Sequence, residues 1–116
     1  MNLLKETKES LRQAGYTLDD IQSVQGDTLR ISVERFIALA DVDYGKDHSE
    51  SPEVAIDLVI IMKDGSFFTR ACNDGVEWWR HVKTPVVLPE VSDDKVESLV
   101  RGPGCIGAWD LEDIQE

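Results

Sequence analysis

Five carboxylates lie close together in the segment from 41 to 57, which is the densest cluster of reactive side chains in the sequence: Asp41, Asp43, Asp47, Glu50 and Glu53. Carboxylates two to four residues apart along an extended chain are separated by several ångströms, comparable with the phosphates of a nucleic-acid strand, which follow one another at about 3.4 Å of rise. The segment can therefore present a row of negative charges to a basic nucleic-acid channel. The alternative is a solvated loop whose charge serves solubility.

The start of this loop also resembles a calcium-binding sequence. Asp41, Asp43 and Asp47 alternate with other residues as in an EF-hand loop. An EF-hand loop has glycine at its sixth position and glutamate at its twelfth, whereas here glycine stands fifth and Pro52 twelfth. The sequence therefore predicts no metal site, and we expect no cofactor.

Residues that act as nucleophiles or general bases in enzymes are sparse. His48 lies in the acidic loop and His81 in a predicted strand, and neither accompanies a known nucleophile motif. Cys72 and Cys105 are thirty-three residues apart, which indicates reduced thiols rather than a disulfide framework. We expect a protein that is not an enzyme.

The charge of the chain restricts its partners. Its 116 residues suit a single domain, 1–116, and carry 12 basic and 23 acidic side chains, a net charge of −11. This charge disfavours direct binding to nucleic acid or to an anionic membrane and favours a basic partner. The segments 41–57 and 84–116 carry −5 and −6, whereas 58–83 carries +1. The N-terminal residues lack the apolar core of a signal peptide, so we expect a cytoplasmic protein.

The spacing of apolar residues predicts helices over 3–14 and 33–43, each with a capping side chain at its start, Asn2 or Ser32. Thr17 and Asp20 form a capping box for a single helical turn. A weaker pattern indicates a hairpin within 22–31, with a two-residue turn at Gly26. A further short helix is expected after Ser92.

Two Asp-Gly pairs, Asp64-Gly65 and Asp74-Gly75, predict two-residue hairpin turns and hence a three-stranded antiparallel meander. With two-residue turns, Trp78 lies on a mainly apolar face with Leu58, Ile60, Met62 and Phe67. The other face is mixed and carries Val59, Ile61, Phe68, Arg70, Trp79 and His81. The fold predicted is therefore α+β, a meander of three to five strands with helices on the face of Trp78, and the C-terminal segment is expected to cover the face of Trp79.

Trp79 has two interpretations under this register. Beside Arg70 it can make a cation–π contact within the fold, or it can serve with Phe68 and Arg70 as an anchor for a partner.

The segment from 31 to 83 resembles a group of small acidic phage and prophage proteins. The sharpest common element is the hairpin Asp74-Gly75-Val76-Glu77-Trp78-Trp79, which follows Asp64-Gly65-Ser66-Phe67-Phe68-Thr69-Arg70. In architecture and charge, but without a common motif, the chain is also similar in outline to anti-CRISPR proteins that imitate DNA.

The leading expectation is a non-enzymatic inhibitor of phage type. Its acidic loop would take the place of phosphates on a basic nucleic-acid-binding protein such as a CRISPR effector, inside the host cytoplasm if a phage encodes it. The alternative is a toxin-immunity or other interaction module that binds through the sheet around Trp79, and a small-molecule enzyme comes third.

Overall fold

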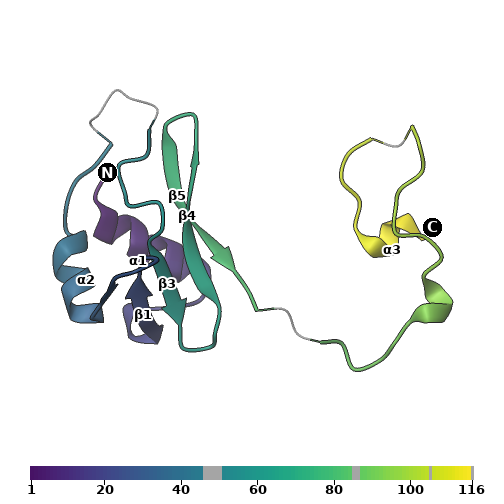
Figure 1. Cartoon of the computed structure of the whole chain (residues 1–116), viewed down its shortest axis with the longest axis horizontal. Coiled ribbons are helices and arrows are strands. Elements are labelled where there is room, and N and C mark those ends of the chain that lie inside the picture. Colours follow the sequence, from purple (N-terminus) through teal and green to yellow (C-terminus); the bar gives the residue numbers. More distant parts are fainter. Residues whose placement is uncertain (46–50, 85–86, 105, 116) are drawn as a thin grey trace. The chain divides into compact units, whose positions relative to one another are not determined.

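The computed structural model describes residues 1–45, 51–84, 87–104 and 106–115 (Figure 1). It contains two compact units, Met1–Thr84 and Pro85–Glu116. The expectation of a single domain stays a prediction. No helix among the described residues is long and apolar enough to cross a membrane.

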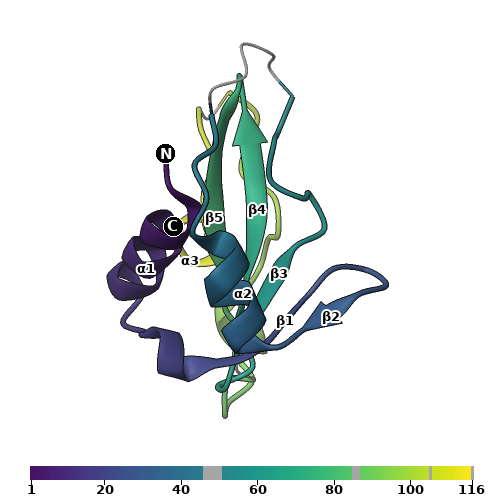
Figure 2. The ribbon, with the colours of Figure 1, turned by 90° about the vertical axis from the view of Figure 1, so that its left-hand side faces the viewer.

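The first unit is an antiparallel sheet of five strands in the order β2-β1-β3-β4-β5. The strands are β1 (Ile21–Gln25), β2 (Arg30–Ile31), β3 (Val59–Met62), β4 (Phe67–Asn73) and β5 (Val76–Val82). Helices α1 (Leu3–Gln13) and α2 (Val33–Ala40) lie on one face of this sheet (Figures 1 and 2). The predicted α+β class is confirmed.

The helices begin where the sequence predicts. Asn2 and Ser32 cap α1 and α2 by accepting hydrogen bonds from the amides of Lys5 and Arg35. The predicted capping box of Thr17 and Asp20 is present at the short 3₁₀ helix η1 (Leu18–Asp20). α2 ends at Ala40 instead of 43. The following residues leave the helix because Val42 accepts a backbone hydrogen bond from Leu3 (3.0 Å).

The two strand pairs β1–β2 and β4–β5 test the predicted turns. β1 and β2 form the expected hairpin, but Gln25 pairs with Arg30 and the Gly26 amide donates to the Leu29 carbonyl (2.8 Å), so its two-residue turn is at 27–28, one residue later than predicted. In the β4–β5 turn both Asp74 (φ 51°) and Gly75 (φ 80°) are left-handed, as a two-residue type I′ turn requires. Its predicted register is confirmed, including the pair Arg70 and Trp79.

The β3–β4 turn is longer than predicted. Ile61 pairs with Phe67, and the Met62 amide donates to the Ser66 carbonyl (2.8 Å), which leaves a three-residue loop, 63–65. Only Gly65 in this loop has positive φ (89°), the arrangement of a type I turn followed by a left-handed residue. The pairing is therefore shifted by one residue relative to the predicted one.

This shift moves every β3 side chain to the other face of the sheet, because side chains alternate along a strand. Ile60 and Met62 lie beneath the helices with Phe68 and Trp79. Trp79 is 6% exposed, whereas Trp78 is 41% exposed on the opposite face. The predicted assignment of faces is wrong, and the helices cover the face of Trp79.

The second unit has little regular structure. It contains a 3₁₀ turn, η2 (Asp93–Lys95), and a short helix, α3 (Leu111–Ile114). Of the short helix predicted after Ser92, the described residues form only this 3₁₀ turn. The Gln115 side chain holds this unit together: its Oε1 accepts from the amides of Glu97 (2.8 Å) and Ser98 (3.1 Å), and its Nε2 donates to the Ser98 carbonyl (2.6 Å).

Candidate functional site

The described part of the acidic loop presents its carboxylates at the surface. Asp41, Asp43 and Glu53 are all exposed. Asp41 accepts a hydrogen bond from the Asn2 side chain (2.9 Å), and Glu53 accepts one from the Gly45 amide (2.6 Å). Asp47 and Glu50, the other two predicted members, lie outside the described residues.

Both ends of this loop are attached to the folded unit. At its start, Asn2 and Asp43 form a β-bridge, and the Tyr44 amide donates to the Met1 carbonyl (2.7 Å). At its end, the amides of Glu53 and Val54 both donate to the Glu77 carboxylate, at 2.8 and 3.1 Å. The loop therefore leaves and re-enters the fold at fixed positions, and Glu53 joins its two ends through Gly45.

Beneath this loop lies a buried ionic cluster centred on Arg70, whose side chain is 4% exposed. Its guanidinium donates to Glu6 (3.0 Å) and Glu77 (3.4 Å) and lies 4.7 Å from the centre of the Trp79 ring. The Tyr44 hydroxyl donates to Glu6 (2.7 Å). Burial, reinforced by this hydrogen bond, raises the pKa of Tyr44 to about 12. Tyr44 and Glu77 thus connect the acidic loop to the core.

The predicted partner anchors occupy this interior. Phe68 is 2% exposed and packs in the core with Trp79. Arg70 makes the cation–π contact with Trp79, the intramolecular one of its two interpretations. The physical reason is the shifted β3 register, which turns this face toward the helices. These three side chains are buried and do not form the exposed anchor that was predicted.

A second polar cluster was missed by sequence reasoning. Ser66 Oγ donates to Asp64 (2.6 Å) and lies 3.0 Å from His81 Nε2, and the Tyr16 hydroxyl also donates to Asp64. The hydrogen bonds from Ser66 and then Tyr16 lower the pKa of Asp64 from 3.8 to about 2. The only local signal was the turn itself, because an aspartate two residues before a serine often accepts its amide hydrogen bond.

The presence of serine, histidine and aspartate here does not make a catalytic triad. In a triad the carboxylate orients the histidine, whereas here it accepts a hydrogen bond from the Ser66 hydroxyl itself. Ser66 is also only 4% exposed. The cluster instead fastens the β3–β4 turn to β5 and to the segment after α1.

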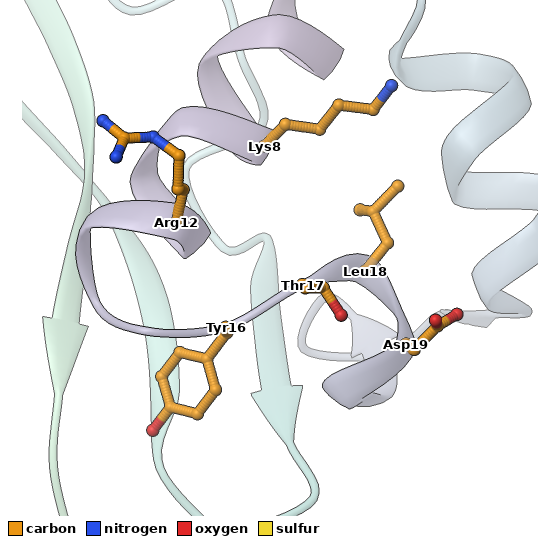
Figure 3. A pocket seen from close by; sticks show the side chains of 6 residues that line it. All are labelled: Lys8, Arg12, Tyr16, Thr17, Leu18 and Asp19. Atoms are coloured by element: carbon orange, nitrogen blue, oxygen red, sulfur yellow. The ribbon is translucent and has the colours of Figure 1, made fainter.

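A pocket of about 430 Å³ lies between α1 and the 3₁₀ helix η1 (Figure 3). Its charged side chains do not converge on one point: Arg12 and Lys8 extend in different directions. Arg12 is also paired with Glu9. Within the described ranges, no three His, Cys, Asp or Glu side chains are grouped as a metal site.

No protein-family model, curated protein or solved structure matches this chain.

The carboxylates of the described part of the acidic loop are exposed, whereas the hydroxyl groups of the Asp64 cluster are directed at Asp64. In the Arg70 cluster, the buried Nε of Arg70 has no hydrogen-bond partner among the described residues. Long-range contacts that no local pattern encodes, such as those from Glu77 to Glu53 and Val54, position the loop.

Proposed function

We propose that this protein is a non-enzymatic inhibitor of phage type that binds a basic nucleic-acid-binding effector through its acidic loop. The observation that supports the proposal best is the attachment of the loop at both ends, through Asn2 and Asp43 and through Glu77. A loop with fixed ends loses less conformational entropy when it binds, so its carboxylates can replace phosphates on lysine and arginine side chains more effectively than a free tail.

The net charge of −11 also supports a basic partner. Charge complementarity increases the rate at which two proteins associate, and this effect weakens with salt because exposed charges are screened within about 8 Å at physiological ionic strength. The proposed mechanism is competitive occupancy of a nucleic-acid channel, for example in a CRISPR effector.

The test neutralises two described carboxylates of the loop and keeps Glu53, which joins its ends, with Asp41→Asn and Asp43→Asn in one variant. The matched control is Asp19→Asn with Glu34→Gln, which removes the same charge from exposed positions outside the loop. In cells with an active CRISPR system, the wild type and the control should raise the plaque count of a targeted phage. The loop variant should raise it much less.

Binding to the purified effector at two salt concentrations completes the experiment. The loop variant should bind more weakly and with a flatter salt dependence than the control. No plaque increase and no effector binding by the wild type would contradict the inhibitor proposal. Equal binding by both variants would show that the loop is not the interface.

The second candidate is an immunity or interaction module that binds through the sheet, on the opposite face from the one predicted. Trp78 (41% exposed) and Val76 (63%) lie there, beside the half-buried Phe67 and Ala71. Large exposed aromatic side chains are typical anchors of protein interfaces. Under this alternative, Trp78→Ala should weaken partner binding and the loop variant should not.

A further inference from the structure

A groove runs along the free edge of the sheet, separate from the acidic loop. It has a volume of about 410 Å³ and lies between the second half of α1 and β5. Ser10 and Gln13 line it from the helix, and Trp79, His81 and Lys83 line it from the strand and the residue after it. Figure 2 shows α1 lying alongside β5, on the side away from β4.

The backbone of β5 is open on this side. β5 is the last strand of the sheet and pairs only with β4 among the described residues. Next to a two-residue turn, the flanking pair Asn73 and Val76 is hydrogen-bonded, and alternate residues of β5 then bond to β4. The amide and carbonyl groups of Trp79 and His81 therefore point away from β4. No backbone partner for them is found in the described part of the chain.

The charge of the groove is opposite to that of the chain. Lys83 is exposed in it, and none of its lining residues is a carboxylate, although the whole chain carries −11. The lining residue Gln13 donates a hydrogen bond to Glu9 (3.2 Å), but that carboxylate is already paired with Arg12. Glu77, the nearest acidic residue of β5, has its carboxylate turned inward to Arg70 and 5% exposed. An acidic segment meets less repulsion here than at other surfaces of the protein.

We infer that this groove binds an extended, acidic peptide segment of a partner protein, which adds a strand to β5 beneath α1. Backbone hydrogen bonds to Trp79 and His81 would hold the segment, and Lys83 would select its charge. The inference does not depend on the acidic loop or on the inhibitor proposal, since it uses the opposite charge and a different surface.

The test uses the full chain and three fluorescent synthetic peptides: alternating valine and glutamate, the same peptide with prolines in place of alternate residues, and one with lysine in place of glutamate. Anisotropy should show binding of the first peptide and none of the proline peptide, because proline cannot donate the strand hydrogen bonds. The lysine peptide is repelled from the groove by Lys83, so any binding of it to the acidic loop should leave the exchange of the Trp79 and His81 amides unchanged. Failure of the acidic peptide to bind, or equal binding of the proline peptide, would overturn the inference.

Two variants test the location of the site. Gln13→Trp should fill the groove and abolish binding, whereas Lys8→Trp, which adds the same bulk on the other flank of α1, should not. Lys83→Glu should weaken the binding of the acidic peptide about tenfold and should allow the lysine peptide to bind in the groove. Because Lys83 is exposed, this variant keeps the test valid if Gln13→Trp fails to fold.

Amide hydrogen exchange supplies a readout specific to strand addition. The amides of Trp79 and His81 should exchange more slowly when the acidic peptide binds, and those of Trp78 and Arg80, already bonded to β4, should change little. Binding without this alternation would mean that the peptide lies elsewhere, and the inference would be wrong.

Discussion

The indole nitrogen of Trp79 donates a hydrogen bond to the hydroxyl of Thr7, at 2.9 Å and across 72 residues of sequence. Thr7 is fully buried in α1, and its hydroxyl in turn donates to the Leu3 carbonyl (2.7 Å). This chain of hydrogen bonds fixes the position of α1 on the edge strand. It also satisfies the polar group of the most buried tryptophan, which would otherwise be costly to enclose.

The two adjacent tryptophans should differ in their contribution to stability. Trp79→Ala removes a core side chain and should lower the free energy of unfolding by about 3 to 5 kcal/mol. Trp78→Ala, at an exposed position, should lower it by about 1 kcal/mol or less. Urea unfolding followed by circular dichroism measures both. Similar losses at the two positions would contradict the assignment of faces.

Thr7→Val should destabilise the protein although it preserves shape. The variant leaves the buried Trp79 N–H without an acceptor, which should cost about 1 to 3 kcal/mol. Thr7→Ser keeps the hydroxyl and is the matched control, since it loses only a methyl group. If valine proved as stable as serine in urea unfolding, the hydrogen bond would have no energetic role.

Arg70→Met should be among the most destabilising single changes. It leaves Glu6 and Glu77 as buried carboxylates without their cation, which should cost about 3 to 5 kcal/mol. Arg12→Met, in an exposed pair with Glu9, should leave the free energy of unfolding nearly unchanged. Thermal unfolding of the two variants beside the wild type measures the difference. A small effect at Arg70 would argue against a buried pair.

The protein should lose stability in acid as the Asp64 carboxylate becomes protonated. Its folded pKa of about 2 lies below its ordinary value of 3.8. Its contribution to stability is therefore fully present above about pH 4 and is lost as the pH falls toward 2. Asp64→Asn should reduce the fall in melting temperature across this range, whereas Asp19→Asn, on the exposed start of η1, should not. Identical acid profiles for the wild type and Asp64→Asn would disprove the role of the carboxylate.

Some features of the candidate sites are predicted by local sequence signals, and others depend on contacts between residues far apart in the chain. The acidic loop is visible in the sequence because it is a matter of composition. Its attachment is not, since Glu77 lies twenty-four residues from Glu53. The Arg70 cluster and the groove along β5 depend on where α1 crosses the sheet, and no spacing of residues along the chain encodes that position.

The sequence alone determined the elements whose signals are local. Capping side chains set the starts of α1 and α2, and Asp74-Gly75 set the β4–β5 register because both residues can adopt positive φ. Asp64-Gly65 contains the same two residue types, yet only Gly65 has positive φ there, and the loop also includes Lys63. The three-residue loop places Ile60 and Met62 on the core face with Phe68. A two-residue loop would place them on the face opposite to Phe68. Tertiary packing decided this register, because the apolar area buried against α1 and α2 outweighs the small preference between two turn types.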